Sequence, residues 1–376
     1  MSGATERAFV AAHAADGTWQ ELVKSCVARL TPLPKNASLG FVYVTDALAD
    51  DLGKILKALK ERTGVQHWVG SVGLGICSPG AEIFERPAVS VMLATLPDGS
   101  FQVFSPLAEP TQGFDPKTGA WLNENRPALS VVHGDPRGHD LGGIVASISS
   151  KNSHFVVGGV TSARKRPLQV ADEVTEGGIS GAMFGPEVTT VTGFTQGCRP
   201  IGPMHRITAA HGNVITMIDD RPATDVLREE IGELLSRDLH RITRQVFPGF
   251  KLMGGEDGEY LVRNFTGFDI ENKTVTVGYN ISAGDSILFC RRDASNAIAD
   301  LQRMLEGIKR RTDKPVRGGL YFSCIMRGPN LFAAENEEVD LIRATLGDIP
   351  LAGFFGNGEI SGDQIYFYTS VFVAFV

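Results

Sequence analysis

The feature that most constrains the fold of this chain is a pattern that is written twice along it. A short apolar strand is followed by a helix, a second apolar strand, a glycine-rich turn with a Glu-Ile pair, and another strand. Near the N-terminus the pattern runs from Phe41 to Leu96, and near the C-terminus it runs from Gly319 to Val376. Strands and helices that alternate in a repeated order predict an internally repeated α/β protein.

A weaker third copy begins at Leu129–Val132, continues through a helix near 139 to 150 and reaches a strand at Phe155–Gly159. Amphipathic helices flank very apolar strands in all copies, so sheets packed between outer helix layers are expected. We therefore predict an α/β (α+β) fold of two similar domains with repeated strand-helix-strand units, in an αββα-like arrangement.

The length of 376 residues exceeds what one hydrophobic core usually serves, so two domains are expected. Asp219–Ala223 combines aspartate and proline in the manner of a helix start and marks the predicted boundary. The predicted division is a helical lead-in at 1–37, a first domain at 38–222 and a second domain at 223–376.

Composition excludes several classes of protein. A net charge of -7 gives no positive field that would gather nucleic acid. Five scattered cysteines predict reduced thiols instead of a disulfide framework or a zinc site. No apolar stretch reaches the roughly twenty residues of a membrane helix, and the N-terminal residues do not resemble a signal peptide, so a cytoplasmic location without membrane insertion is expected.

The sequence also lacks the familiar catalytic motifs. There is no Gly-x-Ser-x-Gly elbow, Walker loop, HExxH pair or complete Rossmann fingerprint. We predict that the protein is not an enzyme. The alternative is a cysteine-dependent hydrolase that would use Cys324 or Cys198.

The C-terminal glycine turn is the first candidate for a binding site. Gly353, Gly356 and Gly358 let the backbone approach a ligand closely, or they serve only a tight connection between strands. Glu359 follows in an apolar strand, where a carboxylate seldom stands without a partner. It either holds the ammonium group of an amino acid-like ligand or forms a structural ion pair. The candidate partners for such a pair are Arg199, Arg263 and Arg327.

Two further groups have alternative interpretations. Arg199 is either a clamp for an anion, because guanidinium binds carboxylates in bidentate fashion, or a hydrogen-bonding brace for its turn. Cys324 is either a thiol activated by the nearby arginine or an inert small hydrophobic residue at a strand end.

Taken together, several motifs support a family. They are Cys198–Pro203, Asp219–Ala223, Tyr260–Arg263, Gly284–Asp285, Phe322–Cys324 with Arg327–Gly328, and Gly353–Ile360. From about residue 38 to its end the chain resembles the FIST (F-box and intracellular signal transduction) family, with its N-terminal and C-terminal parts in the expected order.

The resemblance implies a cytoplasmic sensory module that binds a small molecule, such as an amino acid, and passes a conformational signal to a separate partner. That partner would be a signalling protein such as a histidine kinase, a cyclase or a chemoreceptor, because the chain itself shows no such segment. We expect no cofactor. The predicted ligand-binding residues are Arg199, His205, Ser323, Cys324, Arg327, Asn357 and Glu359.

The resemblance also raises a haem alternative, because some relatives in the family bind haem and sense nitric oxide. An axial ligand would be an imidazole that faces a large apolar cavity. His205 is the first candidate, followed by His154 and His211. The competing interpretation of each is a strand histidine satisfied by hydrogen bonds.

Overall fold

The computed structural model describes residues 8–152, 154–232, 245–251 and 260–376. The chain divides into two compact units. The larger unit contains residues up to Thr195, Leu301–Ile365 and Thr369–Val376, and the smaller unit contains Gln196–Asp300 and Tyr366–Tyr368. The smaller unit is thus an insertion between two parts of the larger one. No helix of the described ranges is long and apolar enough to cross a membrane.

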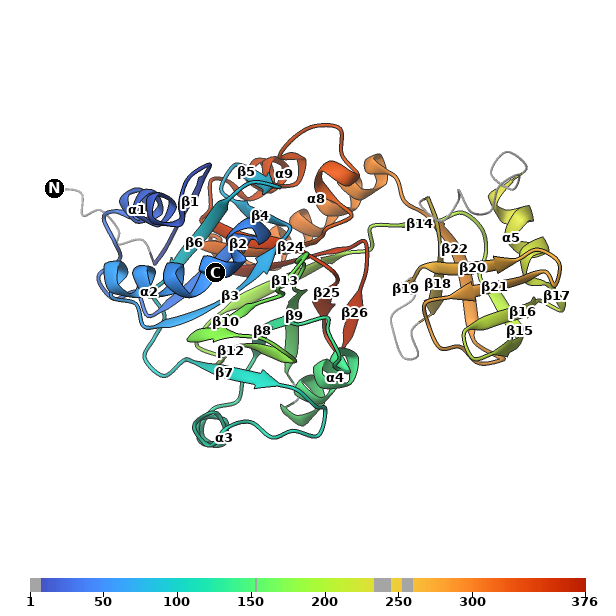
Figure 1. The fold of residues 1–376 in the computed structure, drawn as a ribbon, viewed down its shortest axis with the longest axis horizontal. Helices are drawn as coiled ribbons and strands as arrows, with labels where there is room; N and C mark the ends of the chain where they lie inside the picture. The colour runs from blue at the N-terminus through green and yellow to red at the C-terminus, as the bar shows by residue number, and fades with distance from the viewer. Residues whose placement is uncertain (1–7, 153, 233–244, 252–259) are drawn as a thin grey trace. The chain divides into compact units, whose positions relative to one another are not determined.

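Three mixed sheets form the described part of the larger unit, and we name them sheets A, B and C (Figure 1). In spatial order, sheet A contains β1 (Phe9–Ala15), β6 (Ala88–Ala94), β2 (Leu39–Thr45), β3 (His67–Gly73), β10 (Gln169–Ala171) and β11 (Glu173–Thr175). Sheet B contains β13 (Thr190–Thr195), β27 (Ser370–Phe375), β23 (Gly318–Cys324), β24 (Leu351–Gly356), β4 (Gly75–Ser78) and β5 (Ala81–Phe84). Sheet C contains β7 (Phe101–Leu107), β12 (Ile179–Phe184), β8 (Leu129–Gly134), β9 (Phe155–Val160), β25 (Glu359–Ser361) and β26 (Gln364–Tyr366).

Each sheet contains one copy of the repeated unit. The first and second strands of a copy are parallel and are joined by a helix, as in β2–β3, β8–β9 and β23–β24. The third strand returns antiparallel beside the first, as in β6, β12 and β27. The predicted α/β class and its strand-helix-strand units are therefore confirmed, and the copy in sheet C is as complete as the other two.

The hairpin that follows the second strand leaves its own copy and joins the next sheet. The β4–β5 hairpin pairs with β24 of sheet B, β25 pairs with β9 of sheet C, and β10 pairs with β3 of sheet A. This cyclic exchange ties the three copies into one body, because every sheet contains strands from two copies.

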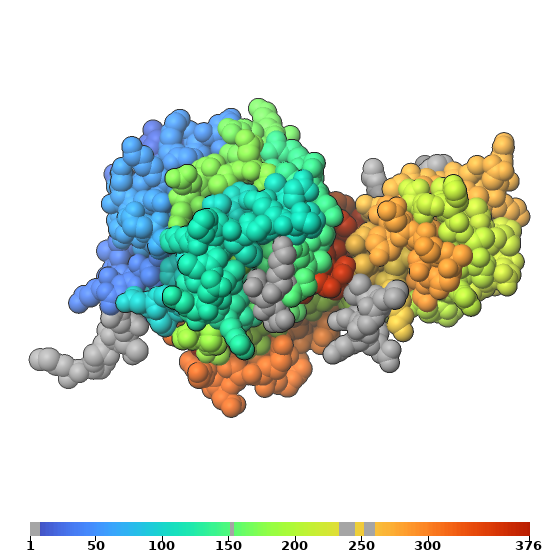
Figure 2. All heavy atoms as spheres, turned by 90° about the horizontal axis from the view of Figure 1, so that it is seen from below, coloured from blue at the N-terminus to red at the C-terminus, as the bar shows by residue number. Residues whose placement is uncertain are grey.

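Helices cover the outer face of each sheet (Figure 1). Sheet A packs against α1 (Trp19–Leu30) and α2 (Leu52–Thr63), which follows the 3-10 helix η1 (Asp46–Asp51). Sheet B packs against α8 (Ala294–Arg310) and α9 (Glu337–Leu346). Sheet C packs against α3 (Pro116–Glu124) and α4 (Leu141–Asn152), and this teal to green part of the chain forms much of the surface in Figure 2. Strands buried on both faces explain the continuous apolar runs in the sequence.

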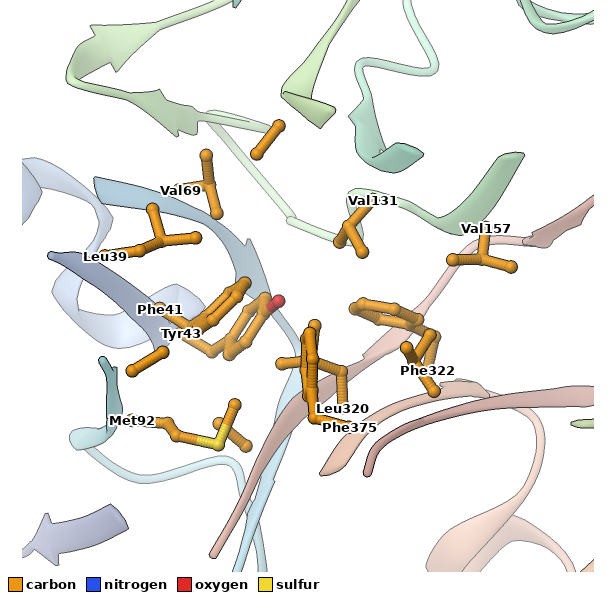
Figure 3. Close-up of a cluster of buried hydrophobic side chains, with 14 of the residues drawn as sticks. Leu39, Phe41, Tyr43, Val69, Met92, Val131, Val157, Leu320, Phe322 and Phe375 are labelled. Carbon is orange, nitrogen blue, oxygen red and sulfur yellow. The ribbon is translucent and has the colours of Figure 1, made fainter. Parts of the chain in front are cut away.

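The inner faces of the three sheets share one apolar core (Figure 3). Tyr43 of β2, His133 of β8 and Phe322 of β23 come from comparable points of the three first strands. Their ring centroids lie 5.6 to 6.2 Å apart in all three pairs. The predicted helix layers are present, but three sheets instead of a stacked pair meet inside them. The hairpin exchange accounts for this difference, since it joins each sheet to both of the others.

The N-terminal segment also has more structure than a helical lead-in. Residues 1–7 lie outside the described residues, but β1 pairs with β6 along its whole length before α1 begins. Thr18 and Glu21 form a capping box at the start of α1. β1 therefore forms the outer strand of sheet A.

The smaller unit is built mainly from antiparallel strands around its own core. Its strands are β14 (Arg199–Pro200), β15 (His205–His211), β16 (Val214–Ile218), β17 (Arg221–Pro222), β18 (Val246–Lys251), β19 (Tyr260–Val262), β20 (Phe265–Asp269), β21 (Thr274–Val277) and β22 (Ser286–Arg291). The helix α5 (Ala223–Ile231) packs on this core through Val226, Leu227 and Ile231.

Candidate functional site

A buried arginine stands at the carboxyl end of β23, where α/β sheets commonly bind ligands. Arg327 follows the strand and precedes the short 3-10 helix η2 (Gly328–Asn330). Its side chain is 0 % exposed, and its Nε donates a hydrogen bond to Glu338 Oε1 at 2.7 Å. Because Glu338 is equally inaccessible to solvent, this is a fully buried ion pair.

Glu338 belongs to the first turn of α9 and faces the sheet. It accepts hydrogen bonds from Tyr321 Oη at 2.6 Å and from Ser323 Oγ at 3.1 Å. Val339 and Ile342 on the same helix are buried against sheet B. The apolar side of α9 therefore carries the carboxylate into the core beside Arg327.

Arg327 has more donors than this pairing uses. Its Nη1 and Nη2 are both buried and have no hydrogen-bond partner among the described residues. The guanidinium carbon lies 5.6 Å from the centre of the Phe332 ring. Burial alone would lower the pKa of Arg327, but the adjacent charge of Glu338 raises it above the usual range. The guanidinium is therefore a cation with spare donors, and a buried donor without a partner costs about 1 to 3 kcal/mol.

Glu359 of β25 is a second buried group with spare capacity. Its Oε2 accepts hydrogen bonds from Thr369 Oγ1 at 2.7 Å and from Thr369 N at 3.2 Å. Its Oε1 has no partner among the described residues. Burial raises the pKa of Glu359 well above its usual value, against the opposing effects of the Thr369 hydrogen bonds and the Arg327 charge. The environment thus favours the neutral acid.

Glu82 of β5 brings a third carboxyl group to the same place through the exchanged hairpin. Its Oε1 accepts hydrogen bonds from the backbone N–H groups of Glu338 at 2.8 Å and Val339 at 3.1 Å. Asn336 Oδ1 accepts a hydrogen bond from Glu82 N at 2.7 Å. Glu82 thus holds the amino end of α9, where a negative charge is favourable. Burial and the nearby Glu338 charge nevertheless raise the pKa of Glu82 to about 8.

Several predicted site residues meet in this cluster. Ser323 and Arg327 both contact Glu338, and Glu359 lies close enough for its charge to affect the pKa of Arg327. Cys324 is buried and contributes its backbone, which donates to Thr369 O and accepts from Arg327 N. Asn357 is exposed, and its backbone N–H donates to Val160 O.

The three turn glycines are explained by the backbone. A Cβ at Gly353 would lie 1.8 Å from Tyr321 O, and one at Gly356 would lie 2.6 Å from Val160 O. Gly358 has a φ of 155°, which other residues rarely adopt. The glycines thus bring the β24–β25 connection close to neighbouring strands. This close approach positions Glu359, which follows the connection.

Arg199, His205 and Arg263 belong to the smaller unit. Arg199 is exposed on β14. His205 Nδ1 lies 2.7 Å from Asp219 Oδ2, and its Nε2 lies 3.3 Å from Glu230 Oε1. A shared pocket of Arg199 and His205 with Arg327 stays a prediction.

The surroundings of the histidines bear on the haem alternative. In His205 both ring nitrogens face carboxylates, so the Nε2 that would bind iron meets Glu230 instead of an open apolar cavity. His154 Nε2 lies 2.7 Å from Ser130 Oγ, and burial lowers the pKa of His154 to about 4. His211 is exposed. As described, His205 does not fit an axial ligand.

The sequence did not identify Glu338, Tyr321, Thr369 or Glu82 as site residues. A signal for Glu338 was available, since it stands four residues before Ile342 in the apolar stripe of a helix. Thr369 had no such signal, because its contact with Glu359 depends on how β25 and β27 are joined.

Comparison with known proteins gives two family matches that together extend over residues 38–362. The model described as the FIST N domain matches residues 38–221, and the model described as the FIST C domain matches residues 223–362. The two matches meet near the predicted boundary, whereas the compact units divide at 195/196 and 300/301.

Relatives of similar length are found in mycobacteria. An uncharacterized protein of Mycobacterium tuberculosis is 29% identical over 331 residues, which cover 86% of this chain and 85% of the relative. An uncharacterized protein of Mycobacterium bovis is 29% identical over 334 residues with the same coverage. Human F-box only protein 22 is 32% identical over 105 residues, which are 27% of this chain and 22% of that protein.

Proposed function

Because the chain belongs to the FIST family, whose domains are associated with signal transduction, we propose that it is a sensor that binds an amino acid-like molecule between Arg327 and Glu359. The ligand is small and carries one negatively and one positively charged group. Its carboxylate takes the spare donors of Arg327, and its ammonium group takes the spare oxygen of Glu359. No catalytic role is proposed.

The observation that carries this proposal is the pair of unused groups. Arg327 Nη1 and Nη2 and Glu359 Oε1 are buried without partners in the part of the chain that the structure describes. Buried polar groups are nearly always hydrogen-bonded, so such gaps need an explanation. A guanidinium and a carboxyl group that act on each other's pKa match the two ends of a zwitterion.

Both side chains are 0 % exposed, so the described state is closed and entry requires movement. The connection between β23 and α9 contains Met326, which is 40% exposed and lies next to Arg327. Gly328 in the same connection has a φ of 52°. Opening of this short connection would expose the guanidinium, in the manner of loops that close over ligands.

A route for the signal begins at Thr369, which holds Glu359. The preceding residue, Tyr368, belongs to the smaller unit and has a φ of 66°, an uncommon conformation for a bulky residue. Its hydroxyl group donates a hydrogen bond to Asn264 Oδ1, and its ring packs on Phe247. A change at Glu359 would act on this strained segment and shift the population that a partner protein recognises.

The alternatives have less support. Cys324 and Cys198 are both buried, so neither presents an accessible nucleophile in this state. No geometry among the described residues favours haem binding. A cytoplasmic location and a histidine kinase, cyclase or chemoreceptor as the partner stay predictions.

Thermal unfolding with each of the standard amino acids tests the ligand site. A ligand at a hundredfold excess over its Kd should stabilise the protein by about 2.7 kcal/mol. Glu359→Gln retains the size of the side chain but loses its charge, so we expect this response to disappear. Arg137→Lys, which changes a half-exposed arginine after β8, is the control and should respond like the unmodified protein.

The pH dependence of binding adds a second readout. The free state favours a protonated Glu359, and an ammonium group would favour its carboxylate. Binding should therefore release a proton, and the affinity should rise with pH. The proposal is wrong if no amino acid stabilises the protein, or if Glu359→Gln responds as strongly as the control.

A further inference from the structure

A second arginine, in the smaller unit, contacts two aromatic rings. The guanidinium carbon of Arg263 is 5.3 Å from the centre of the Tyr279 ring and 5.1 Å from the centre of the Phe367 ring. The Tyr279 ring also stacks on Phe250 with ring centroids 5.0 Å apart. Arg263 is therefore one layer of an ordered column that involves four side chains.

The column is held by its neighbours in the chain. Asn264 O accepts a hydrogen bond from Gly278 N at 2.9 Å, which fixes Tyr279 beside Arg263. Asn264 Oδ1 accepts a hydrogen bond from Tyr368 Oη, which fixes the adjacent Phe367. The backbone N–H of Arg263 donates to Pro248 O at 2.9 Å. These bonds hold the rings before any ligand binds.

Arg263 has no carboxylate partner within 4.0 Å among the described residues. Its one described side-chain hydrogen bond runs from Nη1 to the adjacent Val262 O at 3.0 Å. Burial lowers the pKa of Arg263, against the opposing effects of Tyr279 and Tyr366. Two cation–π contacts partly replace the counter-charge that the described residues do not supply. The column thus holds a guanidinium whose charge is unmatched among the described residues.

The edge of the column is accessible. Tyr279 is 37% exposed, and Arg263 and Phe367 are half-buried. A planar guanidinium offers its N–H groups along its edge, where two parallel hydrogen bonds fit an oxyanion.

We propose that Arg263, held beside the Tyr279 and Phe367 rings, is a binding site for an oxyanion group of a ligand, either a carboxylate or a phosphate. This site is separate from the Arg327–Glu359 cluster and does not depend on the function proposed for that cluster. It assigns a ligand-binding role to the smaller unit itself.

Titration of the full-length protein with inorganic phosphate and, separately, with acetate tests this site. The ionic strength is held constant with chloride, so that general screening does not change. Nitrogen-15 NMR of the arginine Nε–Hε groups is the readout. One signal should shift and saturate, and Arg263→Lys should remove it. In Arg292→Lys, which replaces an arginine that lies over the Tyr368 ring, the shift should persist.

Tyr279→Leu provides a variant that retains Arg263 and its NMR signal. Loss of one stacking face should weaken the apparent affinity by roughly three- to tenfold, the range expected for one cation–π contact. Saturation by phosphate alone assigns a phosphate group, saturation by acetate alone assigns a carboxylate, and saturation by both supports a general oxyanion site. A linear response to both anions, or a saturating shift that survives Arg263→Lys in a folded protein, overturns the proposal.

Discussion

Two arginine clusters stand at comparable points of the repeated scaffold, and they differ in how completely their polar groups are satisfied. Arg137 follows β8 in sheet C, and Arg327 follows β23 in sheet B. The side chain of Arg137 is 51% exposed, whereas that of Arg327 is 0 % exposed. One arginine is thus hydrated at a surface, and the other is enclosed.

The partners differ in the same way. Asp135 accepts four hydrogen bonds, three from Arg137 and one from Gly177 N, and Glu176 adds a second carboxylate to Arg137. Around Arg327 three carboxyl groups meet one cation, yet Arg327 Nη1 and Nη2 and Glu359 Oε1 have no hydrogen-bond partner among the described residues. The Arg137 cluster shows that this position in the repeat does not require polar groups without partners. The unpaired groups at Arg327 therefore need a separate explanation.

The largest expected effect is the loss of the buried counter-charge. Glu338→Gln would leave Arg327 charged and enclosed without a carboxylate partner, and breaking a buried pair in this way costs about 3 to 5 kcal/mol. Urea unfolding of the variant should show a lower midpoint with a similar dependence on denaturant.

A double replacement sharpens the comparison. Arg327→Met with Glu338→Met removes both charges, and exchange of a buried pair for apolar residues is often neutral for stability. We expect it to recover most of the lost stability but none of the response to a ligand. A double variant that still responds would show that the pair has only a structural role.

The sequence predicted much of the fold because the relevant signals are local. Apolar strands, amphipathic helices and glycine turns repeat at 41–96 and 319–376, and the structure has the corresponding elements there. The hairpin exchange could not be predicted in the same way. The short strands β4, β10 and β25 pair with sheets distant along the chain, and nothing in their sequence specifies the partner strand.

The candidate site was predicted in part for the same reason. Arg327 and Glu359 were found because charged residues in apolar surroundings are visible in a sequence. Glu82 was not among the predicted residues, and its neighbours depart from the C-terminal copy, yet the exchanged hairpin carries it to the end of α9. The cluster combines residues of two copies, so one copy read alone shows only part of it.

A smaller effect is expected from Glu82, as a change in how stability depends on pH. Its pKa is about 8 in the folded state and near 4.5 when exposed, so the folded state binds more protons between these values. Stability should therefore fall as the pH rises from about 5 to 8. Glu82→Gln retains the acceptor for α9 but cannot ionise, so this pH-dependent loss of stability should be smaller in the variant.

Glu85→Gln is the matched control for this measurement, because Glu85 follows the same hairpin and its side chain is 79% exposed. Its stability profile should follow that of the unmodified protein. Parallel pH profiles of stability for Glu82→Gln and the unmodified protein would mean that Glu82 is hydrated. Its charge would then not interact with the charged groups around Arg327.

The smallest effect is expected in the cluster after β8. Glu176→Gln removes a carboxylate that is 54% exposed and lies 3.1 Å from Arg137 Nη2. Exposed pairs contribute about 0 to 1 kcal/mol, because water and salt screen the charges and ordering two long side chains costs entropy. Urea unfolding at low and high salt should show a small difference that salt removes. We infer that enclosure, and not position in the repeat, sets the strength of these clusters. A loss of stability as large as that of Glu338→Gln would contradict this inference.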